Sequence, residues 1–276
     1  MDTRAIGVFD SGLGGLTAAR SLRQILPREN LIYFGDTARV PYGGRSRETL
    51  LKYARQDLRF LRSRDLKAVL VACGTVSTTS LDTLQAENDL PIVGVVEPTC
   101  RRALAVTREK RVGLIATQAS VRSGAYEAAL RRLDPQVDVL CRPCPLFVPL
   151  VENGRFERGD TVIETVAREY LSPLLEWGAD TLILGCTHYP LMKDIIGGFM
   201  GAETALVDAG EQCARWVKKQ LELDGLRNGR PGAGRRRYYV SDSTEDFSDL
   251  ASIFLGEDVH GEVEQIDITA YERGEL

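Results

Sequence analysis

Two cysteines with matching surroundings are the residues best suited to do chemistry in this sequence. Cys73 lies in Ala-Cys-Gly-Thr and Cys186 in Gly-Cys-Thr-His, and each tetrapeptide begins at the end of a short apolar run. A free thiol has a pKa near ~8.5, so little of it is thiolate at pH 7 unless a base or a positive charge helps. His188 follows Cys186 closely enough to help it, and Asp10 is placed to help Cys73. The pattern singles out both cysteines as reactive thiols.

Short apolar runs that alternate with helical patterns must position these cysteines. We expect buried strands at residues 5–9, 31–34, 68–73, 92–95, 112–116, 137–140, 181–185 and 205–207. Helices are expected over 14–26 and 46–62, and the second has apolar residues at the spacing of one buried face. Strands that are apolar on both faces and separated by helices are typical of parallel sheets covered on both sides. The predicted fold class is α/β.

The spacing of the two cysteines indicates a repeated unit. They are 113 residues apart, about the length of a domain. In open α/β sheets, ligands bind beyond the carboxyl ends of the strands. We therefore infer two similar α/β units, each presenting a cysteine from a strand end to a shared cleft.

A glycine-rich segment, Asp10-Ser11-Gly12-Leu13-Gly14-Gly15, follows the first expected strand. Glycines let the backbone approach a ligand closely, and free N–H groups at a helix start favour an anion. The segment is not a dinucleotide fingerprint, because Thr17 occupies the third glycine position. A tight turn between strand and helix explains it about as well as a functional loop with Asp10 at its tip.

The remaining cysteines and the histidines give little support for a metal or redox site. Cys141 and Cys144 form a single Cys-x-x-Cys. Zinc would need further ligands, and the sequence has no second such pair and only two histidines, which do not form a cluster. Cys100 and Cys213 fall in helical patterns and are expected to pack as small apolar residues. We expect neither a metal site nor a disulfide framework.

The composition excludes several classes of protein. Hydrophobic residues make up 43% of the 276 and charged residues 27%, values typical of a folded soluble protein. A net charge of −4 argues against a dedicated nucleic-acid binder, and the Gly- and Arg-rich segment 226–237 is expected to be a solvated loop. No apolar run approaches the roughly 20 residues of a membrane helix, and the start has no apolar signal core. We expect a cytoplasmic location.

The chain resembles the cofactor-independent glutamate racemases over nearly its whole length. The resemblance rests on ordered segments rather than on one motif. These segments are Val8–Thr17, Tyr33–Gly43, the stretch around Cys73, Ser123–Tyr126, Cys144–Glu152 and Leu184–Leu191.

The resemblance implies a reaction that needs two opposed groups. In that family, two cysteines act as acid and base on opposite faces of the amino-acid α-carbon, which assigns these roles to Cys73 and Cys186. Asp10 would assist Cys73, and His188 with Glu152 would assist Cys186. No cofactor is implied, so the site must exclude water and stabilise a carbanion with placed hydrogen bonds.

The resemblance also implies a set of substrate contacts, some of which are altered here. The implied contacts are Asp10, Ser11, Pro41, Tyr42, Gly43, Gly74, Thr75, Thr117, Ser120, Thr187 and His188. Gly74 stands where the family has an Asn that donates to the substrate, so one hydrogen bond worth ~1.5–3 kcal/mol is missing. We expect weaker substrate affinity or a water that replaces the Asn, and the same reaction. Ser120 replaces the second threonine hydroxyl of a family loop, and Ala209 replaces a serine.

Glutamate racemase that supplies D-glutamate for peptidoglycan is the leading hypothesis. Two alternatives stay open: a racemase of another small substrate, of the aspartate or hydantoin type, and a binding protein that has lost turnover. The resemblance implies a homodimer and a small-molecule substrate, with no nucleic-acid partner. It also implies a first domain of residues 1–97 plus 209–276 and a second of residues 98–208.

Overall fold

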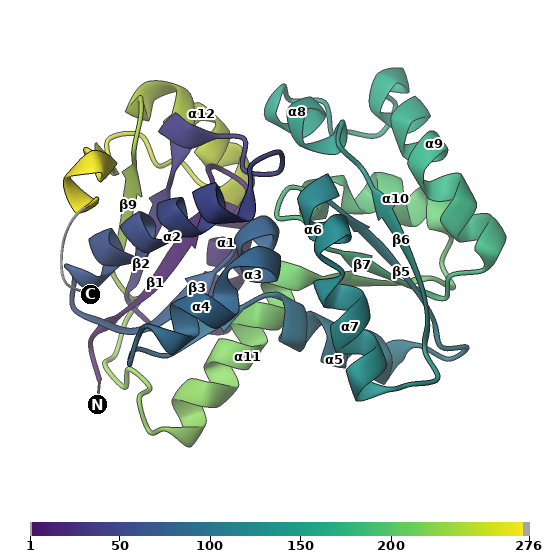
Figure 1. Cartoon of the computed structure of the whole chain (residues 1–276). Coiled ribbons are helices and arrows are strands. Elements are labelled where there is room, and N and C mark those ends of the chain that lie inside the picture. Colours follow the sequence, from purple (N-terminus) through teal and green to yellow (C-terminus); the bar gives the residue numbers. More distant parts are fainter. Residues whose placement is uncertain (1, 273–276) are drawn as a thin grey trace.

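The computed structural model describes residues 2–272 and shows an α/β fold built on two sheets. Figure 1 shows the sheets side by side, each lying among helices. Every strand pairing among the described residues is parallel. The predicted fold class is confirmed.

The first sheet has six strands in the order β10-β9-β2-β1-β3-β4. Its strands are β1 (Ala5–Asp10), β2 (Leu31–Gly35), β3 (Leu66–Val71), β4 (Ile92–Gly94), β9 (Arg236–Val240) and β10 (Val263–Gln265). Alternate residues of β1 enter different clusters: Ile6 and Val8 pack with α1, α11 and α12, whereas Ala5 and Phe9 pack with α2. Because both faces are covered, the central strand is apolar throughout, as the sequence predicts.

The second sheet has four strands in the order β6-β5-β7-β8. They are β5 (Arg111–Ala116), β6 (Asp138–Pro143), β7 (Thr181–Leu184) and β8 (Ala205–Asp208). Leu114 of β5 packs with α5 and α7, and Ile115 packs on the other face with α9 and α10. This second cluster is continuous with the core behind β1, so one apolar core joins the two halves.

The helices connect successive strands. They are α1 (Leu16–Ile25), α2 (Arg47–Arg62), α3 (Gly74–Thr79), α4 (Leu81–Ala86), α5 (Val96–Val106), α6 (Gln118–Ser123), α7 (Ala125–Leu133), α8 (Phe147–Glu152), α9 (Thr161–Trp177), α10 (Lys193–Met200), α11 (Ala209–Leu223) and α12 (Thr244–Leu255). Short 3₁₀ turns occur at Thr37–Arg39, Tyr189–Met192 and Ile268–Tyr271.

The expected elements are present, with shifts of one to three residues at their ends. The helix expected over 46–62 begins at Arg47, because Ser46 caps it and its Oγ accepts a hydrogen bond from Thr49 N at 3.3 Å. The helix expected over 14–26 is α1, which starts two residues later. The strand expected over 68–73 ends at Val71, which leaves Cys73 two residues beyond it.

The C-terminal part of the chain returns to the first sheet. There β9 pairs with β2, and Figure 1 shows this late strand beside the early ones. The expected loop over 226–237 ends earlier than predicted, because Arg236 and Arg237 already belong to β9. The domain boundaries at 97/98 and 208/209 stay a prediction. Residues 1 and 273–276 of the expected first domain lie outside the described part.

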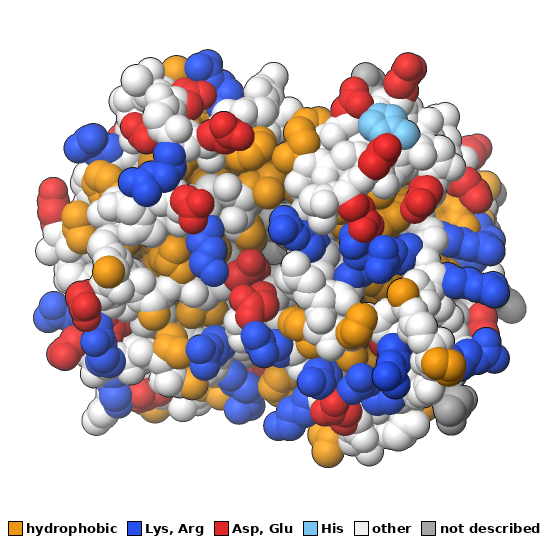
Figure 2. All heavy atoms as spheres, turned by 180° about the vertical axis from the view of Figure 1, so that it is seen from behind, with side chains coloured by type: hydrophobic (Ala, Val, Ile, Leu, Met, Phe, Trp, Pro, Cys, Tyr) orange, Lys and Arg blue, Asp and Glu red, His pale blue; other side chains and the backbone are white. Residues whose placement is uncertain are grey.

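The exterior of the molecule carries mixed charge. Figure 2 shows acidic and basic side chains interspersed over the rear face. Within residues 2–272, no helix combines the length and the apolar character that a membrane crossing needs.

Candidate active site

Both predicted cysteines line one cavity at the junction of the two halves. The cavity has a volume of about 440 Å³, enough for a small amino acid. β3 ends at Val71 and β7 ends at Leu184, so each cysteine stands two residues beyond its strand. Because the carboxyl ends of parallel strands are where α/β proteins bind ligands, equivalent positions in the two sheets face the same space.

Most of the other predicted site residues line the same cavity. These are Ser11, Pro41, Tyr42, Gly43, Gly74, Thr75, Thr117, Glu152, Thr187 and His188. Asp10 and Ser120 do not line it and lie behind the wall, each only 1% exposed. The direct substrate contacts expected of these two residues stay predictions. In the structure Asp10 lies beside Cys73 and Ser120 lies beside Thr117, and both of these neighbours line the cavity.

The surroundings of Cys73 favour a neutral thiol. Cys73 is buried at the start of α3, beside Asp10 at the end of β1. Burial, followed by the nearby charge of Asp10, raises the pKa of Cys73 to about 12. Burial also raises the pKa of Asp10, whose Oδ2 accepts from Gly12 N at 3.2 Å while its Oδ1 has no protein partner. At neutral pH, Cys73 is a proton donor.

The surroundings of Cys186 supply a positive charge. His188 Nδ1 lies 3.9 Å from Cys186 Sγ, and His188 Nε2 lies 2.9 Å from Glu152 Oε1 on α8. Burial lowers the pKa of His188, but its hydrogen bonds with Cys186 and Glu152 outweigh burial and raise the pKa to about 10. The histidine is therefore an imidazolium at pH 7, with one N–H directed at sulfur and one at the carboxylate. Such a neighbour stabilises negative charge on a cysteine sulfur.

Phe254 of α12 supports this histidine from behind. Its ring meets the ring of His188 edge to face, with centroids 5.6 Å apart. Phe254 is fully buried, and α12 packs on α1. The C-terminal helix thus limits how the imidazole can turn.

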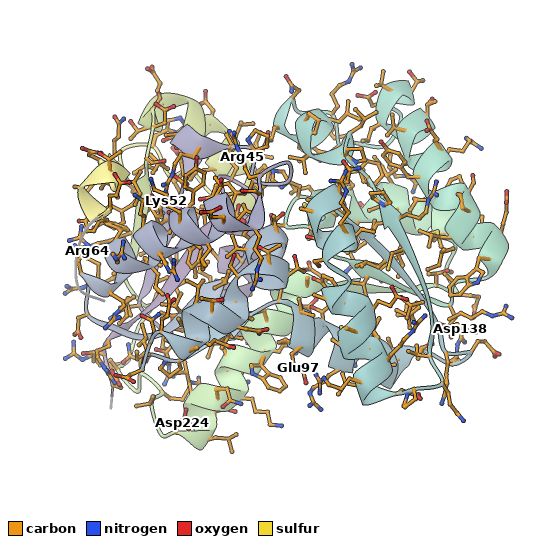
Figure 3. The ribbon with its side chains drawn as sticks, in the orientation of Figure 1. Arg45, Lys52, Arg64, Glu97, Asp138 and Asp224 are labelled. Atoms are coloured by element: carbon orange, nitrogen blue, oxygen red, sulfur yellow. The ribbon has the colours of Figure 1, made fainter. Side chains whose placement is uncertain are left out.

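A network of polar side chains holds the loop that carries Pro41, Tyr42 and Gly43. Tyr42 Oη donates to Asp36 Oδ2 and to Asp57 Oδ2, the latter at 3.1 Å. Arg39 bridges the same two carboxylates, with 2.6 Å from Nε to Asp36 Oδ2 and 2.8 Å from Nη2 to Asp57 Oδ1. Burial and then the charge of Asp36 raise the pKa of Asp57 well above its usual range. Figure 3 labels Arg45, which follows this loop, on the side of the first half that faces the second.

Sequence reasoning missed this anchoring network and part of the cavity wall. Asp57 lies on α2, far from the loop in sequence, and no motif connects them. Val148, Pro149 and Gln118 also line the cavity. Val148 and Pro149 belong to the Cys144–Glu152 segment, and the resemblance of that segment to the racemases could have placed them at the cavity.

Hydroxyl groups from the two halves meet at the edge of the cavity. Thr75 Oγ1 lies 3.1 Å from Thr117 Oγ1, and Thr117 Oγ1 donates to Ser120 Oγ at 3.0 Å. Ser120 therefore acts on the cavity through Thr117, because its own hydroxyl is turned toward that neighbour. The two halves are linked here by a short polar chain.

The remaining cysteines lie where the sequence predicts. Cys100 is in α5 and Cys213 in α11, and both are fully buried. Cys144 is also buried and touches the cavity wall. Among residues 2–272, no three His, Cys, Asp or Glu side chains form a group able to hold a metal ion.

Comparison with known proteins defines the class of this site. The family model described as Asp/Glu/Hydantoin racemase matches residues 16–210, a span that includes both cysteines. This chain, with two parallel sheets and a strand-end thiol on each side of one cavity, is therefore an amino-acid racemase, which is a kind of isomerase.

Close relatives narrow the class further. The glutamate racemase of Geobacter metallireducens is 47% identical over 98% of this chain and 99% of its own. The structure of glutamate racemase from Francisella tularensis in complex with D-glutamate matches with a TM-score of 0.90 and 36% identity, over 98% of this chain and 100% of that one. The structure of the Thermus thermophilus enzyme in complex with β-chloro-D-alanine gives 0.86 and 43%, over 98% and 99%. The chain belongs to the glutamate racemase family.

Proposed function

We propose that this protein interconverts L- and D-glutamate by proton transfer between Cys73, Cys186 and the substrate α-carbon. The observation that carries the proposal is the single cavity walled by both thiols, one from each sheet. Racemisation removes the α-hydrogen from one face and delivers a proton to the other, so opposed groups are the direct solution. Relatives at up to 47% identity bear the name glutamate racemase, which supports glutamate as the substrate.

The two sides of the cavity have different surroundings, which suggests a starting form for the proposed reaction. Cys186 lies beside the imidazolium of His188 and acts as the base, whereas Cys73 holds its proton. In this form Cys186 takes the α-proton, the C–H electron pair stays on carbon as a carbanion, and Cys73 delivers its own proton to the opposite face. The product leaves a thiol at Cys186 and a thiolate at Cys73, ready for the other enantiomer.

The surrounding residues have distinct supporting roles in this proposal. Asp10 assists Cys73, and His188 with Glu152 assists Cys186. The substrate is held by Ser11, Pro41, Tyr42, Gly43, Thr75, Thr117 and Thr187, while Val148 and Pro149 keep water from the reacting carbon. Exclusion of water strengthens each of these interactions with the developing charge.

The wider setting belongs to the same proposal. D-Glutamate made here would feed peptidoglycan synthesis in the cytoplasm, and the enzyme would act as a homodimer. Residues 1–97 with 209–276 would form one domain and residues 98–208 the other, consistent with strands from 5–94 and 236–265 in one sheet and from 111–208 in the other.

Incubation in D₂O tests the proposed chemistry. L-Glutamate, D-glutamate and L-aspartate are each followed by optical rotation and by α-deuterium content. We expect early product from either glutamate enantiomer to carry deuterium while unreacted substrate stays protiated, because separate groups act on the two faces. Rapid label in both pools would indicate one shared base. Turnover of aspartate alone would assign another substrate, and no change with any of the three would indicate a binding protein.

Substitution of each thiol completes the test. Cys73→Ala and Cys186→Ala should each lower kcat by at least about 1000-fold, since each removes a proton carrier. Cys213→Ala, which changes a buried cysteine outside the cavity, is the matched control and should keep its activity. Full activity in either of the first two variants would overturn the assignment.

A further inference from the structure

The two backbones that carry the thiols touch each other beside the cavity. Gly74 directly follows Cys73, and Gly185 directly precedes Cys186. A Cβ atom at position 74 would lie 2.7 Å from the carbonyl oxygen of Gly185, closer than real Cβ contacts come. The obstacle is backbone, which cannot swing aside as a side chain can. Only a glycine at position 74 permits this approach.

The contact falls where this chain departs from the pattern it resembles. An Asn is implied at position 74, and a different loop around Ser120. The two departures adjoin, because the Cβ position of residue 74 is 3.7 Å from Ser120 Oγ. The substitutions therefore occupy one place in the fold, where the two halves are in contact.

Neighbouring contacts leave the two halves little freedom to separate there. Thr75 and Thr117 approach to 3.1 Å between their hydroxyls, next to the Gly74 contact. A second contact lies beside Cys186, where Thr17 Oγ1 donates to the carbonyl of Thr187 at 2.8 Å. These contacts hold the loops that follow the two strands against the opposite half.

We propose that Gly74 is a positioning residue that sets the distance between the thiols of Cys73 and Cys186 by allowing its loop to rest on Gly185. The inference rests on the proposed two-thiol reaction and deepens it. An added Cβ must move from 2.7 Å to the ordinary contact range of 3.4–4 Å, so the loops have to part by several tenths of an ångström. Cys73 is adjacent in sequence to Gly74 and Cys186 to Gly185, so the gap between the two thiols widens as well.

Gly74→Ala is the test, and Gly197→Ala is its control. Gly74 has no positive φ, so alanine suits its backbone and the variant is expected to fold. Gly197 lies in α10, where a Cβ would meet only Leu206 at 3.4 Å. We expect Gly74→Ala to lower kcat by about tenfold or more, since misplacement near 1 Å costs about 100-fold, with KM changed less than about twofold.

A kinetic isotope effect separates positioning from a general loss of structure. With α-deuterated glutamate, the isotope effect on kcat should rise in Gly74→Ala, because proton transfer across a wider gap becomes rate-limiting. Partial unfolding would lower kcat without changing the isotope effect, and would also lower the thermal midpoint. Gly74→Ala with wild-type kcat and isotope effect, or with lower kcat only in proportion to its folded fraction, overturns the inference.

Gly74→Asn tests whether position 74 acts through the distance between the two thiols or through a direct contact with the substrate. If spacing dominates, this variant loses kcat as the alanine variant does, and its KM does not improve. A lower KM with unchanged kcat would show that position 74 acts through a hydrogen bond to substrate, and would overturn the inference. Wild-type protein without glutamate turnover would instead overturn the proposed function on which the inference stands.

Discussion

At the scale of single residues, the two thiols differ more in their surroundings than in their positions. Both are buried two residues beyond a strand, yet Cys73 faces the carboxyl group of Asp10 and Cys186 faces an imidazolium. For Cys73, burial and the charge of Asp10 both raise the pKa of the thiol. In the proposed reaction the pair exchanges roles, because one proton distinguishes its two forms.

Glu152→Gln tests how that charge is maintained. Removal of the carboxylate should lower the pKa of His188 from about 10, because Glu152 is one of its two raising partners. The alkaline limb of kcat/KM should move to lower pH by about one unit. A pH–rate profile from pH 6 to 11 measures the shift, and His260→Gln, a change at an exposed histidine, should leave it in place. An unmoved limb would show that Glu152 does not set the histidine's charge.

The same histidine links stability to pH. Its pKa is raised in the folded state above the unfolded value of ~6.5, so its contribution to stability is complete below pH 6.5. The contribution is lost as pH rises toward 10. Urea unfolding of wild type should therefore show a steeper loss of stability across that window than Glu152→Gln shows.

At the scale of elements, a short loop depends on a helix for its shape. Tyr42 links the cavity loop to Asp57 on α2, and Arg39 closes the network from the 3₁₀ turn. Tyr42→Phe removes the donor from two buried carboxyl groups and should cost about 1–3 kcal/mol of unfolding free energy. KM should rise because the loop proposed to hold the substrate is released.

Tyr53→Phe is the control for this change. Tyr53 packs against Tyr42 with centroids 5.6 Å apart and ring planes tilted by 43°, and its ring lies under Arg39. The variant keeps these ring contacts. Urea unfolding and steady-state kinetics on both variants measure the outcome, and equal effects from the two would contradict the anchoring role of the Tyr42 hydroxyl.

The elements also show how far the sequence could predict the molecule. Eight strands and the strand-end cysteines were predictable, because local apolar runs report strands and strand ends report ligand sites. The burial expected for the strand over 137–140 was wrong, because β6 lies at the edge of its sheet and is only partly covered. The strand β9 was not, since it begins with two arginines and owes its place to β2, about 200 residues earlier. Asp57 was not predicted as an anchor for a related reason. A contact between two separate elements produces no motif in the sequence that would reveal it.

At the scale of the whole molecule, a buried ion pair ties distant segments together. Lys67 Nζ lies 2.5 Å from Glu29 Oε2 and also donates to the carbonyls of Asp2 and Leu226. Glu29 Oε1 accepts from Asn228 N at 2.9 Å. Both charged side chains are almost fully excluded from solvent. The pair joins β3, the turn before β2 and the chain that leaves α11.

Lys67→Met should strongly destabilise the protein, by about 3–5 kcal/mol, because it removes the cation that donates to the buried Glu29 and leaves only Arg227, 3.6 Å from Nε to Glu29 Oε1. Lys67→Met with Glu29→Gln removes both charges yet keeps an acceptor for Asn228, and should recover most of the loss. Chemical denaturation of the single and double variants measures the difference. A double variant no more stable than the single one would show that the charge of Glu29 is not the cause.

The position of β9 inside the first sheet has a consequence for biosynthesis. All strands of the second sheet leave the ribosome in one uninterrupted stretch, whereas the first sheet lacks two strands until residues 236–265 emerge. Until then β2 is an open edge, ready to pair with any extended segment nearby. We expect chains that end near residue 225 and are released from the ribosome to hold a formed second sheet and an unfinished first one, and to be the species that chaperones must shield.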